Sequence, residues 1–393
     1  MLIVKDTALS DTSHNFIATQ VAIEDKITFI LKSDTYSGVE FNFTLASAKN
    51  KIYKGFSVSV HLFKNQYFSQ RDIVDLRLSE ISNRSGKVGY FFRLDSLLED
   101  DILELNEHTF TYAYYALDKL FSNEISIQTK DYVYDGGIPS ITDFFDGDTI
   151  ILVICNEYSS DVENFKINNY LPSLFTKGFI KFDKEKSIEV FNNSNLITEN
   201  FNNLKGLDRP DGAFILRSTS IAKELKNETY INHLFTNLLY NDIDVTSKFI
   251  ILYQIIEICI SKVFFVEIQQ KICYEFSDLS SLKLKKILGD IQKEEPRIKK
   301  LLNKYARPDK RIETEIISNI EKFNSCVGDV KEESLEDNNT LTSLFYGYRN
   351  RIVHNYRQIH NINVETEKAN ELMKTINENS EVLIASLVCD FKI

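Results

Sequence analysis

The sequence predicts an α+β chain of two domains, an antiparallel β-rich domain followed by an all-α helical bundle. Three observations support this: a length of 393 residues, short alternating or β-branched apolar runs in the first half, and helical periodicity in the second. A polar, turn-rich stretch over residues 192–212 separates the two patterns. We therefore expect domains at 1–205 and 206–393.

The first domain is expected to be a β-sandwich or a partly open barrel, because turn-like clusters separate its apolar runs at short intervals. One stretch, residues 107–121, has helical character instead. The expected strands cover residues 16–22, 27–32, 39–45, 56–63, 74–78, 88–94, 125–134, 150–155 and 178–182.

The second domain shows apolar residues at helical spacing along nearly its whole length. Thr246-Ser247 and Asn339-Thr340 are of the residue types that cap helix N-termini. The expected helices cover residues 217–240, 246–277, 281–293, 295–306, 311–325, 340–359 and 364–389.

The run 249–266 is nearly long enough to cross a membrane, but it contains Gln254, Glu257 and Lys262. Such residues are costly at a bilayer centre, which favours a buried helix of the bundle and no membrane partner. The N-terminus lacks a signal-like pattern, and the five cysteines show no C-x-x-C pairing. We therefore expect a cytoplasmic protein with reduced thiols.

The net charge of −11 argues against indiscriminate coating of nucleic acid. The charge is uneven, however, because residues 281–311 hold 11 Lys and Arg against only 4 Asp and Glu. This basic segment could follow an RNA backbone, or it could be a solvated helical face.

The predicted helix 340–359 has two distinct faces. Its polar face carries Asn350, His354 and Arg357 at helical spacing. Arginine and histidine together can bind a phosphodiester and move a proton on it. Apolar residues recur every three or four positions along the opposite face, at Leu341, Leu344, Phe345, Tyr348, Ile352, Tyr356 and Ile359.

The string Arg349-Asn350-x-x-x-His354 resembles the R-[polar]-x-x-x-H signature of the HEPN superfamily, many of whose members are metal-independent ribonucleases. The resemblance covers the helical domain and is sharp only over residues 348–356. It implies a helical bundle, no cofactor, and a homodimer in which two motif helices face each other. It also implies that the RNA 2′-OH attacks the phosphate, with His354 in proton transfer and Arg349 as the phosphate clamp.

Further residues are candidates for support or RNA binding. Asn350 could orient His354 or contact phosphate, or it could be solvated. Glu257 needs a partner in its apolar helix, and Arg349 and Lys262 are equally suitable. The candidate RNA-binding residues, which could also be ordinary packing or surface residues, are Arg351, Tyr356, Arg357, Lys299 and Lys300.

Asp143, Asp146 and Asp148 suggest a metal loop, but they lack the ligand spacing of a calcium site. A solvated turn is the better interpretation. No phosphate-binding glycine loop, dinucleotide fingerprint or H-E-x-x-H motif occurs in the chain.

The architecture resembles Apea-like HEPN proteins of prokaryotic anti-phage defence, in which a variable front domain senses infection. We expect a metal-independent endoribonuclease regulated by its N-terminal domain, with RNA as substrate and a phage-derived trigger as a further partner. One alternative is a non-catalytic module for dimerisation or nucleotide binding. Another is a toxin that an antitoxin silences.

Overall fold

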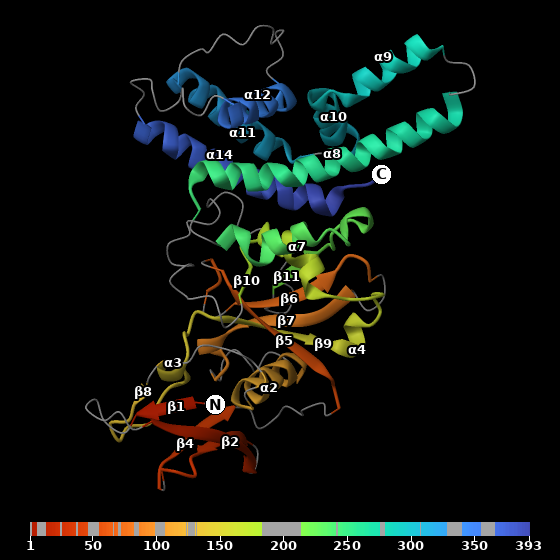
Figure 1. Ribbon diagram of the computed structural model, residues 1–393. Helices are drawn as coiled ribbons and strands as arrows, with labels where there is room; N and C mark the ends of the chain where they lie inside the picture. The colour runs from red at the N-terminus through yellow and green to blue at the C-terminus, as the bar shows by residue number, and fades with distance from the viewer. Residues whose placement is uncertain are drawn as a thin grey trace. The chain divides into compact units, whose positions relative to one another are not determined.

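The computed structural model divides into two compact units (Figure 1). It describes residues 2–5, 13–23, 26–36, 38–45, 55–65, 67–69, 72–81, 86–98, 107–122, 124, 130, 132–182, 214–240, 243–275, 280–306, 308–327, 340–354 and 366–393. Described residues up to Ser220 belong to the first unit and those from Ile221 to the second. The boundary between the units therefore lies after strand β11 (Phe214–Ser218) and not near residue 205, where the sequence predicts it.

A five-stranded sheet begins the first unit, with the strand order β4-β3-β2-β1-β8. Its neighbours are antiparallel except that β8 runs parallel to β1. The strands are β1 (Leu2–Lys5), β2 (Ser13–Ile23), β3 (Lys26–Lys32), β4 (Glu40–Leu45) and β8 (Tyr132–Val133). Of the expected strand 125–134, residues 125–129 lie outside the described residues.

The second sheet has six strands in the order β10-β5-β9-β7-β6-β11. All neighbours are antiparallel except β11, which runs parallel to β6. Every residue of the central strand β9 is buried, as its continuous apolar sequence predicts. The other bounds are β5 (Val58–Lys64), β6 (Ile73–Leu78), β7 (Lys87–Arg93), β9 (Ile150–Cys155) and β10 (Ile180–Phe182).

Helix α2 (Glu107–Phe121) lies between the two sheets and has the predicted bounds (Figure 1). Its Phe121 ring lies 5.3 Å from Phe29 and 5.2 Å from Phe43 of the five-stranded sheet, centroid to centroid. Its Tyr112 ring lies 5.1 Å from Tyr90 of the six-stranded sheet. The prediction of an antiparallel β-rich unit is therefore confirmed, but the two curled sheets share their core through a helix that a simple sandwich lacks.

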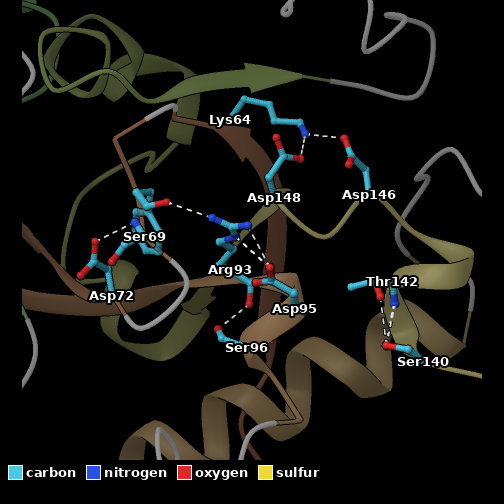
Figure 2. Close-up of polar contacts among 11 residues, drawn as sticks. Lys64, Ser69, Asp72, Arg93, Asp95, Ser96, Ser140, Thr142, Asp146 and Asp148 are labelled. Carbon is cyan, nitrogen blue, oxygen red and sulfur yellow. Dashed lines mark hydrogen bonds and ion pairs between the residues drawn. The ribbon is translucent and has the colours of Figure 1, made fainter. Parts of the chain in front are cut away.

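The three aspartates before β9 have separate roles, and Figure 2 shows two of them, Asp146 and Asp148, beside Lys64. Asp143 lies in helix α3 (Ile141–Phe144), where it accepts a hydrogen bond at 2.7 Å from the amide of Ser140, the N-cap of that helix. Asp146 and Asp148 both pair with Lys64 of β5, Asp146 at 2.6 Å. Burial acts to raise the pKa of Asp146, but the Lys64 ammonium and the Asp148 contact keep it below its ordinary value. The carboxylates thus tie this turn to the sheet.

The second unit is helical, and most predicted helices are confirmed within a few residues. The helices are α7 (Thr229–Thr236), α8 (Val245–Glu275), α9 (Ser281–Gln292), α10 (Glu294–Lys300), α11 (Lys310–Val327), α12 (Leu341–His354) and α14 (Thr366–Asp390). The first unit also contains the short helices α4 (Asn156–Ser159) and α5 (Leu171–Phe175).

The expected helix over 217–240 is wrong in its first part. Residues 217 and 218 instead end strand β11, which pairs with β6, and a 3-10 turn follows over Lys223–Leu225. Pairing with a neighbouring strand outweighs the local helical pattern, because strand preference depends on context.

Helix α8 is the longest in the described part of the chain, and Asp244 caps it. The amides of Thr246 and Ser247 both donate to Asp244 Oδ1 at 3.0 Å, so the cap precedes the predicted residues. By length and composition α8 could cross a membrane, which is weak evidence because core helices of soluble proteins pass the same test. Its buried residues include Phe249, Tyr253 and Cys259.

An ion pair joins the start of α8 to α14. Lys248 Nζ contacts Glu381 Oε1, and the Glu381 side chain is fully buried. One turn away, Asn377 Nδ2 donates to the carbonyl of Val245 at 2.6 Å. Burial raises the pKa of Glu381, and the Lys248 charge offsets this only in part.

Replacing Lys248 by Met should destabilise the second unit by about 3–5 kcal/mol at neutral pH, because Glu381 would be left buried without a partner. The loss should shrink as the pH falls, since a carboxyl with a raised pKa is neutralised and its penalty disappears. Urea unfolding followed by far-ultraviolet circular dichroism at pH 5 and pH 8 would measure this. Equal losses at both pH values, or no recovery in Lys248→Met/Glu381→Leu, would contradict it.

Gly89 of β7 leaves no room for a side chain. A Cβ there would lie 2.1 Å from the carbonyl oxygen of Val153 in β9. Gly89→Ala should therefore destabilise the first unit by about 1–3 kcal/mol. Gly289→Ala in α9 is the control, because nothing lies within 4 Å of its Cβ position, and helix propensity predicts a gain of up to about 1 kcal/mol. Calorimetric unfolding that leaves Gly89→Ala unchanged would refute the steric argument.

Candidate functional site

Helix α12 presents the predicted motif. The hydroxyl of Thr340 accepts from the amide of Ser343 at 3.3 Å, so Thr340 acts as the expected N-cap. The apolar stripe is buried at Leu341, Phe345, Tyr348 and Ile352, which confirms the two-faced helix. The described part of the helix ends at His354. The candidates Tyr356 and Arg357 lie outside the described residues.

Aromatic packing fixes α12 in the bundle. The Tyr348 ring is 1% exposed and lies edge-on to Phe249 of α8 at 4.7 Å and to Phe323 of α11 at 5.1 Å. Phe345 stacks on Tyr253 of α8 with ring centroids 6.0 Å apart. The side of α12 opposite the motif therefore packs against α8 and α11, and Tyr348 is a packing residue.

Arg349 brings the three motif residues together. Its Nη1 donates to Asn350 Oδ1 at 3.0 Å and lies 3.5 Å from His354 Nε2. Residues five apart on a helix are rotated by about 140°, so helix geometry alone would point Arg349 and His354 in different directions. The length of the arginine side chain closes that separation. His354 is exposed and the Arg349 side chain is 19% exposed.

The same guanidinium faces two carboxylates through its other terminal nitrogen. Arg349 Nη2 lies 3.5 Å from Glu257 Oε1 of α8 and 4.0 Å from Glu294 Oε2 of α10. This placement answers the question left open for Glu257, because Lys262 pairs with Glu228 at 2.6 Å instead. Glu294 was missed by sequence reasoning, which counted it only as a charge of the basic segment.

Tyr253 completes the arrangement beneath Arg349. The guanidinium carbon lies 5.5 Å from the centre of the Tyr253 ring, and the Tyr253 hydroxyl donates to Glu294 Oε1 at 2.7 Å. Burial, together with the nearby Glu294 carboxylate, raises the pKa of Tyr253, so the hydroxyl stays protonated as a donor. Helices α8, α10 and α12 each contribute to this group.

The basic segment contributes fewer free cations than its composition suggests. Lys300 pairs with Glu267 of α8 at 2.5 Å, and Arg297 lies 5.2 Å from the Phe264 ring centre. Lys299 is exposed, as an RNA contact would require. Arg351 is half-buried, and the Nη1 atom of its guanidinium is enclosed by protein.

Among the described residues, no group of three or more His, Cys, Asp or Glu side chains is placed to hold a metal ion. A scan of the chain against protein-family models gave no match, and searches of curated proteins and of solved structures gave no significant match either. The functional assignment therefore depends on the motif residues and their geometry.

Tyr348 allows a direct test of the packing role. Its hydroxyl has no hydrogen-bond partner among the described residues, so Tyr348→Phe should change the free energy of unfolding by less than about 1 kcal/mol. Tyr348→Ala should cost about 3–5 kcal/mol, because it leaves a cavity between Phe249 and Phe323. Chemical unfolding would measure both. Similar losses in the two variants would mean that the hydroxyl has a partner.

Proposed function

We propose that this chain is a metal-independent endoribonuclease with Arg349, Asn350 and His354 as its catalytic residues. One observation carries the proposal: Arg349 Nη1 lies 3.0 Å from Asn350 Oδ1 and 3.5 Å from Nε2 of the exposed His354. A phosphodiester held by this guanidinium would lie beside an imidazole. Imidazole can accept or donate a proton near neutral pH.

The reaction that suits these groups is internal transfer of the phosphate. The RNA 2′-oxygen attacks the adjacent phosphorus while His354 removes the hydroxyl proton. The bond from phosphorus to the 5′-oxygen breaks, and an acid protonates the leaving oxygen. Arg349 stabilises the charge that develops on the phosphate oxygens. The products are a 2′,3′-cyclic phosphate and a 5′-hydroxyl end.

A homodimer would complete this site. The reaction uses a base and an acid, and each chain carries a single histidine in the motif. Val353, which is 43% exposed, and His354 lie on a side of α12 that is open within the described residues. We propose that His354 of the partner subunit supplies the second proton-transfer group, and that α12 of each chain faces the other.

The biological role that we propose follows the resemblance to Apea-like HEPN proteins. The second unit would cleave RNA in the cytoplasm in an abortive response to phage, and the β-rich first unit would regulate it in response to a phage-derived trigger. This role is argued from analogy of architecture.

A non-catalytic binding module is the second candidate, and one observation favours it. Arg349 pairs with Glu257 and Glu294, as an arginine that only stabilises the helical bundle would do. A toxin silenced by an antitoxin would use the same nuclease chemistry and differ only in its partner.

Incubation of the full-length protein with RNA in EDTA tests the proposal. We expect cleavage that leaves 2′,3′-cyclic phosphate ends and falls at least about 100-fold in Arg349→Ala and in His354→Ala. If the site uses His354 of both subunits, mixing the wild type with excess His354→Ala should lower activity below the share of wild-type chains, because a mixed dimer would hold a single His354. Lys322→Ala on α11 is a control outside the site. RNA that binds but stays intact would favour the binding module.

A further inference from the structure

The two carboxylates beside Arg349 differ in how the protein holds them. We propose that Glu294 is a positioning residue that fixes the guanidinium, whereas Glu257 occupies the place of the substrate phosphate and leaves when RNA binds. This inference rests on the proposed function and adds a role for each acid. It predicts opposite effects for two chemically identical substitutions.

Glu294 is held on two sides. Its Oε1 accepts from the Tyr253 hydroxyl at 2.7 Å, while its Oε2 faces Arg349 Nη2 at 4.0 Å. The Glu294 side chain is 21% exposed and Tyr253 is 3% exposed, so both lie largely within the bundle. Because Tyr253 also lies under the guanidinium, Glu294 and Tyr253 restrict where Arg349 can point. Such bracing is the usual means of preorganising a catalytic arginine.

Glu257 is held on one side only. Its side chain is 47% exposed, and among the described residues its only ion-pair or hydrogen-bond partner is Arg349, at 3.5 Å. Partly exposed ion pairs contribute little to stability, so the structure loses little when this contact opens. The exposed position also lets an incoming anion reach the same guanidinium nitrogen.

A phosphate suits the position that Glu257 would vacate. Carboxylate and phosphate oxygens both match the planar donor fork of arginine. An anion at Nη2 would keep the Nη1 contacts with Asn350 and His354, so the bound phosphate would lie on a guanidinium that is already oriented toward the imidazole. The displaced carboxylate would disfavour anions that cannot compete for Arg349.

Two full-length variants, Glu257→Gln and Glu294→Gln, test this assignment. Glu257→Gln should lower KM and tighten binding of RNA about two- to fivefold, since a weak competitor of that size is removed. Glu294→Gln should lower kcat about tenfold with a smaller effect on binding, and Tyr253→Phe should do the same more weakly. Binding is measured by fluorescence anisotropy with an RNA that carries 2′-deoxyribose at the cleavage positions.

Glu371→Gln on α14 is the matched control, because it removes an exposed negative charge of the same kind elsewhere in the second unit. It should change neither KM nor binding. The tighter binding of Glu257→Gln must also disappear in an Arg349→Ala background. If the tighter binding persists there, or if Glu371→Gln binds RNA as tightly, general charge repulsion explains the effect. The proposal that phosphate replaces Glu257 at Arg349 would then be wrong.

The outcomes separate this inference from the nuclease itself. If the wild-type protein binds RNA without cutting it, the proposed nuclease function fails. The anisotropy measurement on Glu257→Gln would still show whether Glu257 competes with RNA for Arg349. If RNA is cut but Glu257→Gln weakens binding, Glu257 supports Arg349 and does not compete with phosphate. Unchanged kcat in Glu294→Gln, with normal unfolding, would overturn the positioning role.

Discussion

The site depends on the packing of one face of α12 against α8 and α11. Tyr348 is enclosed by Phe249 and Phe323, and Phe345 lies on Tyr253. Because these rings fix both the rotation and the depth of α12, the residue after Tyr348 must project toward α8 and α10. Arg349 therefore reaches Glu257, Glu294 and the Tyr253 ring. The polar chemistry is a consequence of apolar packing on the other side of the helix.

Much of the fold could be predicted because its patterns are local. The helix 107–121 and the buried strand 150–155 have the predicted bounds. The predictions that were wrong concern elements whose structure depends on partners distant in sequence. β11 is a strand because β6 offers an unpaired edge, and α2 separates the sheets because aromatic residues from both meet on it. No window of the sequence contains those partners.

The site was predicted in part for the same reason. Arg349, Asn350 and His354 lie within six residues of one helix, so the sequence places them on adjacent turns, but the Arg349–His354 contact also requires the arginine side chain to reach across a rotation of about 140°. The choice of Glu257 between Arg349 and Lys262 required the packing of α8, because both cations are plausible partners by charge. Glu294 carries no signal in sequence, since its place beside Arg349 depends on packing and on a hydrogen bond with a tyrosine 41 residues away.

The position of β11 has a consequence for dissecting the chain. A fragment cut near residue 206, where the sequence changes character, would carry β11 without β6, which pairs with all five of its residues. The strand would then expose an unpaired backbone edge and the apolar Leu216, a combination that promotes aggregation. An isolated helical unit should therefore begin at Ile221. If a longer fragment is insoluble, the cause would be β11 without its partner strand β6, and the result would not bear on the activity of the helical unit.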